Sequence, residues 1–374
     1  MTRSFVRAGI ERGITRLAVA ALAVAAAATT AQAQRIFGAV MMADSSPARA
    51  AIVQAADSTG AIVGRELTTA RGDFVLPVPR AGRYTVTALR VGSVAEVVRD
   101  LAVQGDTRLR IRFTRDTPRP PVTEMRSGER CDIRRDSTLV GLAWGQFQVA
   151  LMTADMAAET KSFVGTWRRT ERTLGRTLKD TVARSDTSEV YPLELPSIPP
   201  LAPDSSREFG FVVESEHGVT YHVPDLAILR SDAFTRARCF AFDPAPPSQP
   251  GWIGLHFRSR EFRVGVAEVE GTIWLDRATL EPRGVGYRYT NLPPAFDASE
   301  AGGTLRFRQL PTGHWIVEEY TLRVPTGAFR RIFSYDTRGR VNGYATKLTL
   351  EGVRTAALLL TTLELNGTPI LRRP

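Results

Sequence analysis

The sequence predicts a mainly β protein: a seven-stranded-type β-sandwich at the N-terminus, then a larger antiparallel, half-barrel-like β domain with one packed helix. Short apolar segments separated by Gly, Pro, Asp and Ser recur between residues 36 and 113 and again after residue 210. This punctuation is typical of β-strands. One long segment, 138–156, instead carries apolar residues at helical spacing. The 374 residues are enough for two domains that each bury a core.

Residues 1–33 have the three parts of a cleaved signal peptide. Four Arg residues precede an apolar run at 17–28, and Ala31-Gln32-Ala33 has the small-x-small form of a cleavage site. The run is short for a bilayer-spanning helix, so we expect cleavage after Ala33, with an uncleaved anchor as the alternative. Because no later segment is long and apolar enough to span a bilayer, the sequence predicts a periplasmic or secreted protein of the bacterial envelope.

The mature chain has two cysteines, Cys131 and Cys239. In an oxidising compartment two cysteines most simply form a disulfide. Two buried free thiols are the alternative.

The formal net charge of +10 falls to +7 when the four Arg and one Glu of residues 1–33 are removed. Basic and acidic residues are interspersed, without the basic runs that nucleic-acid binding favours. We therefore expect no nucleic-acid partner. A mildly basic surface favours anionic lipid or polysaccharide.

The first module is expected at residues 34–115, with strands near 36–40, 50–53, 61–63, 68–76 and 82–87. Gly72 and Gly82 stand at turn positions that favour positive φ. Phe74 and Tyr84 are expected to point into the core. These residues keep the fold and do no chemistry.

The order of landmarks in this module resembles the carboxypeptidase regulatory-like family, which has a transthyretin-like, carbohydrate-binding-like fold. The resemblance rests on Gly-x-Val, Ala-x-Val, Thr-x-x-x-Gly-x-Phe and Pro-x-x-Gly-x-Tyr, which match here at Gly38, Val40, Ala51, Val53, Thr68, Gly72, Phe74, Pro79, Gly82 and Tyr84. It implies a non-catalytic sandwich of the kind that accompanies envelope proteins.

Residues 116–130 are Pro-rich and charged, as in a stiff linker, and residues 131–374 form the second domain. The helix at 138–156 is expected to pack on a sheet. We expect strands near 163–172, 252–257, 269–275, 284–290, 304–310 and 315–324, with two or three more within 329–365. The stretch 185–207 is polar and Pro-rich.

Two further resemblances concern this second domain. Residues 271–283 resemble half-barrel lipoprotein carriers, which hold acyl chains in a hollow beneath a curved sheet. Residues 131–325 resemble an uncharacterised group of secreted bacterial proteins, which implies no function.

No motif for a zinc peptidase, a serine hydrolase or a nucleotide-binding loop is present in the sequence. We therefore expect no catalytic, cofactor-binding or metal-binding residues. Aromatic residues in the strand-rich region are expected to pack in the core, and the alternative is a concave face that binds sugar or lipid. The candidates for such a face are Trp274, Tyr287, Tyr289 and Trp315.

The sequence thus favours a non-catalytic envelope protein that binds a ligand, such as a carbohydrate, or an envelope protein partner. A carrier of lipid or another apolar ligand is the first alternative. The second is an unrecognised hydrolase that uses His217, His222 or His314.

Overall fold

The computed structural model describes residues 34–120, 129–133, 138–160, 162–192, 202–215 and 218–373. The predicted signal peptide lies outside these ranges, as do residues 121–128 of the predicted linker. The described chain is mainly β, with a small sandwich and a large antiparallel sheet, which confirms the predicted fold class. Among the described residues, none of the helices has the length and hydropathy needed to cross a bilayer.

The first module is a sandwich of seven strands in two sheets. One sheet has the order β4-β1-β7, in which β1 pairs antiparallel with β4 and parallel with β7. The other has the order β3-β2-β5-β6. The bounds are β1 (Gln34–Met41), β2 (Ile52–Ala56), β3 (Ile62–Leu67), β4 (Asp73–Val78), β5 (Gly82–Leu89), β6 (Glu96–Val103) and β7 (Thr107–Arg112).

The space between these two sheets is filled by alternate residues of the strands. Burial in β4 follows a strict period of two, so Phe74, Leu76 and Val78 face inward while their neighbours face solvent. Tyr84 is also buried, and its hydroxyl donates a hydrogen bond of 2.7 Å to the backbone oxygen of Arg80. The polar end of this core tyrosine is therefore satisfied at the edge of the sandwich.

Two glycines of this module are sterically required. A Cβ on Gly38 would lie 1.7 Å from the backbone oxygen of Leu109, because β7 runs directly beside β1 at this point. Gly72 has a φ of +79°, and a Cβ there would lie 2.4 Å from the backbone oxygen of Val40. Both positions therefore exclude a side chain.

The expectation of a positive φ at Gly82 is wrong, since this residue is not among those with left-handed backbone. The chain reverses at 79–81, so β5 is already extended when it begins at Gly82. A Cβ there would lie 3.7 Å from the ring of Tyr84, which is ordinary van der Waals contact.

The second domain is built on one antiparallel sheet with the order β12-β13-β14-β15-β16-β17-β18-β8-β9, to which β19 adds by pairing with β18. From β12 to β18 each strand pairs with the next one along the chain, which makes a meander. The bounds are β8 (Phe163–Leu174), β9 (Thr181–Pro192), β12 (Arg238–Asp243), β13 (Trp252–Ser259), β14 (Glu268–Asp276), β15 (Pro282–Thr290), β16 (Gly302–Gln309), β17 (Trp315–Tyr335), β18 (Val341–Leu365) and β19 (Thr368–Arg372).

The polar stretch that begins at residue 185 is strand as far as Pro192, where β9 pairs along the length of β8. One strand prediction in this domain is wrong. The segment 329–365 is not two or three short strands: it is the end of β17 and all of β18, one long hairpin. Register shifts at Thr326/Gly327 and Ser334/Tyr335 let this hairpin run through residues that usually end a strand.

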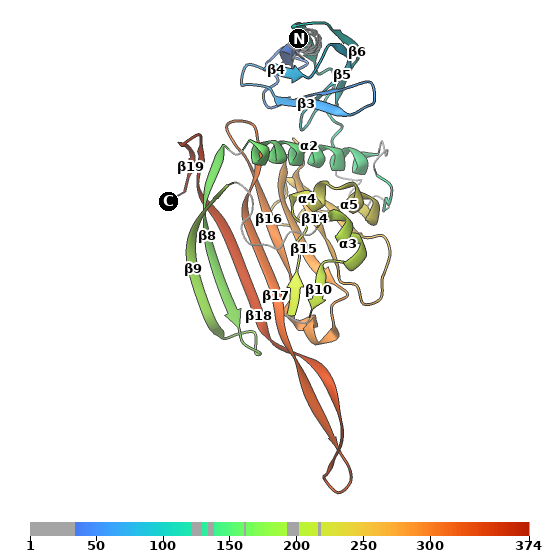
Figure 1. The fold of residues 1–374 in the computed structure, drawn as a ribbon, viewed down its shortest axis with the longest axis vertical. Helices are drawn as coiled ribbons and strands as arrows, with labels where there is room; N and C mark the ends of the chain where they lie inside the picture. The colour runs from blue at the N-terminus through green and yellow to red at the C-terminus, as the bar shows by residue number, and fades with distance from the viewer. Residues whose placement is uncertain are drawn as a thin grey trace, which may run out of the picture.

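The helix α2 (Leu139–Glu159) lies between the sandwich and the large sheet (Figure 1). Its Trp144 and Phe147 enter the core of the second domain, where their rings lie 4.6 Å from Phe240 and 5.7 Å from Phe307 respectively. The prediction of one packed helix is too low, since short helices also pack beside the sheet. These are α3 (Pro203–Phe209), α4 (Leu226–Arg230), α5 (Asp232–Ala237) and the 3-10 helix η2 (Pro294–Ser299), with the hairpin β10 (Val212–Ser215) and β11 (Gly218–Tyr221).

The substitution Gly38→Ala should destabilise the mature protein by at least about 3 kcal/mol, because the added methyl overlaps the backbone of β7. The matched change Gly82→Ala should stay within about 0.5 kcal/mol, since it meets only ordinary contacts. Urea unfolding of both variants measures the difference. Equal destabilisation would show that Gly82 also needs the conformational freedom of glycine.

Candidate ligand-binding pocket

A pocket of about 410 Å³ lies where α3, α5, the start of β12 and the start of β14 meet. Its lining is strongly charged, and arginines outnumber carboxylates. The basic side chains are Arg236, Arg238, Arg260 and Arg263, and the acidic ones are Asp132, Glu261 and Glu268.

Arg238 forms the floor of this pocket and is only 3% exposed. Its guanidinium carbon lies 5.1 Å from the ring centroid of Phe234 and 5.6 Å from that of Phe211, so the cation is held between two aromatic faces. Its Nη2 donates a hydrogen bond of 2.8 Å to Glu268. Burial lowers the pKa of Arg238, and the charge of Glu268 opposes that shift.

The charge of Glu268 is shared by two arginines. One carboxylate oxygen accepts from Arg238, and the other accepts from Arg263. One negative charge thus faces two positive charges. Within the described part of the chain, the Nε and Nη1 atoms of Arg238 have no hydrogen-bond partner.

The order of strands explains how these side chains meet. Arg238 is the first residue of β12 and is paired in register with Ser259, the last residue of β13. The chain that leaves β13 therefore passes over Arg238, and the backbone N–H of Arg260 donates to the oxygen of Ala237 at 2.9 Å. Glu268 then opens β14 beside the same site.

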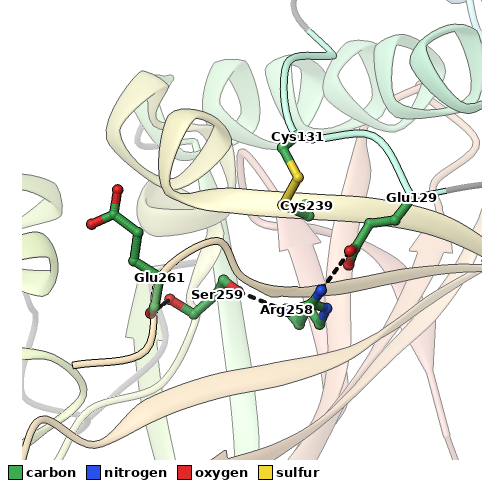
Figure 2. Close-up of a disulfide and its surroundings, with 6 residues drawn as sticks. All are labelled: Glu129, Cys131, Cys239, Arg258, Ser259 and Glu261. Atoms are coloured by element: carbon green, nitrogen blue, oxygen red, sulfur yellow. Dashed lines mark hydrogen bonds and ion pairs between the residues drawn. A yellow bond between two sulfur atoms is a disulfide. The ribbon is translucent and has the colours of Figure 1, made fainter. Parts of the chain in front are cut away.

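A disulfide closes one side of the pocket. Cys131 and Cys239 are bonded, as predicted, and span 108 residues of sequence (Figure 2). Arg130 and Phe240 also exchange two backbone hydrogen bonds of 2.8 and 2.7 Å. A closed loop of this length stabilises the fold by roughly 4–5 kcal/mol in the chain-entropy model.

The same region contains the ion pair between Glu129 and Arg258, which Figure 2 shows beside the disulfide. Glu129, Cys131 and Cys239 place potential metal-ligand atoms within 4.8 Å of one another. Because the two sulfurs are bonded to each other, neither is a thiolate that can bind a metal.

Three of the four candidate aromatic residues are in the core. Tyr287 and Tyr289 are 5% and 6% exposed, and Trp315 is 3% exposed. The hydroxyl of Tyr289 donates 2.8 Å to the backbone oxygen of His222, and that of Tyr287 lies 3.1 Å from the hydroxyl of Tyr320. The side chains of Tyr287, Tyr289 and Trp315 thus pack in the core of the second domain and stabilise the large sheet.

Trp274 lies on the other face of the sheet. It is paired in register with Gly284, whereas Tyr287 is paired with Gly271, and an odd spacing along β14 puts these two positions on opposite faces. Its ring is half-buried and lies 6.4 Å from that of Trp252. Core packing therefore accounts for Tyr287, Tyr289 and Trp315, and the four aromatic residues do not share one face of the sheet.

The candidate histidines have separate surroundings. His217 lies outside the described residues. His222 is 8% exposed and follows β11, whereas His314 lies in the turn before β17 with its ring 5.3 Å from that of Phe163. Burial lowers the pKa of His314 to about 4.

The sequence analysis missed the arginine pocket. The available signal was Arg236-x-Arg238, followed by Arg260 and Arg263 at the end of a strand. Because 46 of the 49 basic residues of the chain are arginines, this spacing did not stand out. Only the register of β12 and β13 brings the four side chains together.

No protein-family model matches the chain, and no curated protein matches it. A type II cohesin–X-dockerin complex from Acetivibrio cellulolyticus is 14% identical over 29% of this chain and 82% of that chain, with a TM-score of 0.20. A 9R-lipoxygenase from Cyanothece is 13% identical over 69% and 40%, with a TM-score of 0.21. The major pilin subunit of Bacillus cereus is 8% identical over 91% and 93%, with a TM-score of 0.18. Likenesses this weak support no conclusion, and membership of the carboxypeptidase regulatory-like family stays a prediction.

Burial of His314 should make stability depend on pH. Its pKa of about 4 in the folded state is below the value near 6.5 expected after unfolding. Neutral His314 therefore makes its full contribution to the free energy of unfolding above pH 6.5, and this contribution is lost as the pH falls toward 4. At pH 5 the loss from this group is about 2 kcal/mol.

The substitution His314→Gln should remove that part of the pH dependence. Urea unfolding of both proteins at pH 7 and pH 5 measures it, because all other titrating groups cancel in the comparison. An identical loss of stability in the two proteins would show that His314 does not titrate in this way.

Proposed function

We propose that this protein is a non-catalytic binding protein of the bacterial envelope, and that its second domain binds an anionic ligand in the pocket around Arg238. One observation supports this most strongly: a buried guanidinium with two nitrogens that have no partner among the described residues. An unsatisfied buried donor costs roughly 1–3 kcal/mol. An oxyanion in the pocket satisfies those donors and the excess positive charge together.

The geometry of arginine favours a planar oxyanion. Nε and Nη1 of Arg238 are the two donors left unpartnered by the described residues, and they point in different directions because Nη2, which lies between them, is occupied by Glu268. Each can donate one hydrogen bond to a ligand oxygen, and a carboxylate is the planar acceptor that arginine pairs with well. Arg260 and Arg236 at the rim are exposed and add positive charge at the entrance. A volume of about 410 Å³ is within the usual range for small-molecule sites.

A carbohydrate that carries a carboxylate fits this set of groups best. Ser206, Asp132 and Glu261 line the same pocket and are the kinds of group that bind sugar hydroxyls. The predicted signal peptide and the disulfide support an extracytoplasmic location, where such polymers occur.

The two alternative functions have less support. In a carrier of apolar ligands the space between helix and sheet is hollow, whereas here Trp144 and Phe147 fill it against Phe240 and Phe307. A hydrolase of this kind would bring histidines together in one pocket, whereas buried His222 and half-buried His314 have different surroundings.

Calorimetric titration of the mature protein with glucuronate, inorganic phosphate and glucose tests the proposal. We expect binding of glucuronate and no binding of glucose. Phosphate distinguishes recognition of the bare anion from recognition of an acidic sugar. Arg260→Gln and Arg236→Gln should each weaken binding about 5–30-fold, the usual cost of a charged hydrogen bond.

Arg168→Gln is the matched control, because Arg168 is an exposed arginine on β8 and does not line the pocket. It should leave affinity unchanged. No binding of either anion at millimolar concentration, or binding that all three variants retain, would refute the pocket as the site.

A further inference from the structure

The strands β17 and β18 continue beyond the large sheet as an arm, formed by residues 326–335 and 341–350 with the turn between them. The pairing of β17 with β16 ends at Arg323, and the pairing of β18 with β8 begins at Val353. Beyond these points the two strands pair with each other. Figure 1 shows the arm extending away from the rest of the molecule.

Exposed apolar side chains are concentrated on this arm. Six of the 16 large hydrophobic residues that are exposed in the described chain lie on it: Phe329, Ile332, Phe333, Tyr335, Val341 and Tyr344. Four of these six are aromatic, with exposed fractions between 47% and 63%. A two-stranded ribbon is only marginally stable in water, so such side chains on a ribbon indicate a surface that something covers.

Three of the aromatic side chains share one face of the ribbon. Phe333 is paired with Tyr344, and their rings lie 6.4 Å apart. Phe329 is on the same face, since it is separated from Phe333 by an even number of residues within one register. Arg331 is on this face too, with its guanidinium 5.1 Å from the ring of Tyr344. Tyr335 follows the register shift at Ser334/Tyr335 and is paired with Val341, another exposed apolar residue.

The opposite face carries Ile332 together with smaller and cationic side chains. Arg330 is paired with Lys347, and Ser334 with Gly343. Across residues 324–352 there are five basic side chains against two acidic side chains, Asp336 and Glu351, a net charge of +3. Glu351 forms an ion pair with Arg330, and Asp336 with Arg340. The basic residues are Arg330, Arg331, Arg338, Arg340 and Lys347.

We propose that this arm docks on the surface of a membrane that contains anionic phospholipid. Tyrosine side chains bind at the level of lipid headgroups, with the ring in apolar surroundings and the hydroxyl in contact with water. Phenylalanine rings on such a surface bury apolar area at the boundary between headgroups and acyl chains. Arginine and lysine bury their stems there and direct their charges to the headgroups. The charge of +3 complements an anionic surface and opposes docking of the arm onto a second copy of itself.

The arm is expected to lie at the interface and not in the hydrocarbon. Each strand of a two-stranded ribbon leaves one edge of backbone N–H and C=O groups unpaired, and the hydrocarbon core cannot satisfy them. The headgroup region contains water and phosphate oxygens that can.

Sedimentation with vesicles tests this proposal on the mature protein. The vesicles are phosphatidylcholine alone, or phosphatidylcholine with about one third phosphatidylglycerol. We expect binding to the anionic vesicles that weakens as salt is raised, because screening shortens the range of the attraction. The variant Phe333→Ser/Tyr335→Ser/Tyr344→Ser should bind at least tenfold more weakly, as should Arg338→Gln/Arg340→Gln.

The control is Phe262→Ser, which removes an aromatic residue that is 78% exposed but lies outside the arm. It should bind vesicles like the unsubstituted protein, as should Arg260→Gln, which affects only the proposed ligand pocket. Circular dichroism shows whether each variant is folded.

Three results would overturn the proposal. They are no binding to anionic vesicles, binding that the arm variants retain, and a dimer in solution that the aromatic variant abolishes. The last result would assign the arm to a second copy of the chain. Binding to soluble polyglutamate that is as strong as binding to vesicles would overturn it as well, in favour of an acidic protein.

Discussion

Both the N-terminal sandwich and the large sheet depend on the burial of α2 between them. Gln146 is 8% exposed, yet its amide is fully used on the sandwich side: it accepts from the N–H of Gly92 at 2.7 Å and donates to the oxygen of Ser93 and the hydroxyl of Thr117. The helix meanwhile directs Trp144 into the core of the large sheet. A buried amide costs free energy unless it is bonded, so this network fixes the sandwich on one side of the helix and the aromatic core fixes the sheet on the other.

The balance of charge in the pocket around Arg238 differs from that in another buried ion cluster, the one around Glu318. Glu318 is 5% exposed and accepts from Arg306, Arg308 and Arg373. Burial raises the pKa of Glu318, but the hydrogen bonds from the arginines outweigh it and the pKa is below its usual value. That carboxylate is satisfied within the fold. At Arg238 the balance of charge is the opposite, because a buried cation has only one carboxylate, which it shares with Arg263, and two of its nitrogens have no partner in the described part of the chain. The ligand that we propose would supply the missing acceptors.

The sequence predicted those elements whose signal is local. The alternation around Phe74 and the two cysteines were sufficient for a sandwich strand and for the disulfide. Prediction from the sequence failed for segments whose structure depends on the strand with which they pair. The strand β9 is polar on both faces, and it is a strand because β8 offers it backbone partners. The arm contains Gly327 and Gly343, which are typical of turns. They lie within strands here because register shifts of the hairpin occur close to them. The arginines of the pocket come together only through the register of β12 and β13. The spacing of arginines in an arginine-rich sequence does not reveal that register.

The two proposed basic sites are far enough apart to act independently. The pocket lies at β12, which is five strands from β17 in the order of the sheet. At about 4.8 Å per strand this separation is roughly 24 Å, about three times the Debye length of ~8 Å at physiological ionic strength. An anionic membrane repels anionic solutes close to its surface. Because that field decays over the Debye length, a pocket held this far from an arm docked on such a membrane would keep its attraction for an anion. Under the two proposals, the wide meander between arm and pocket would therefore separate two sites of the same charge.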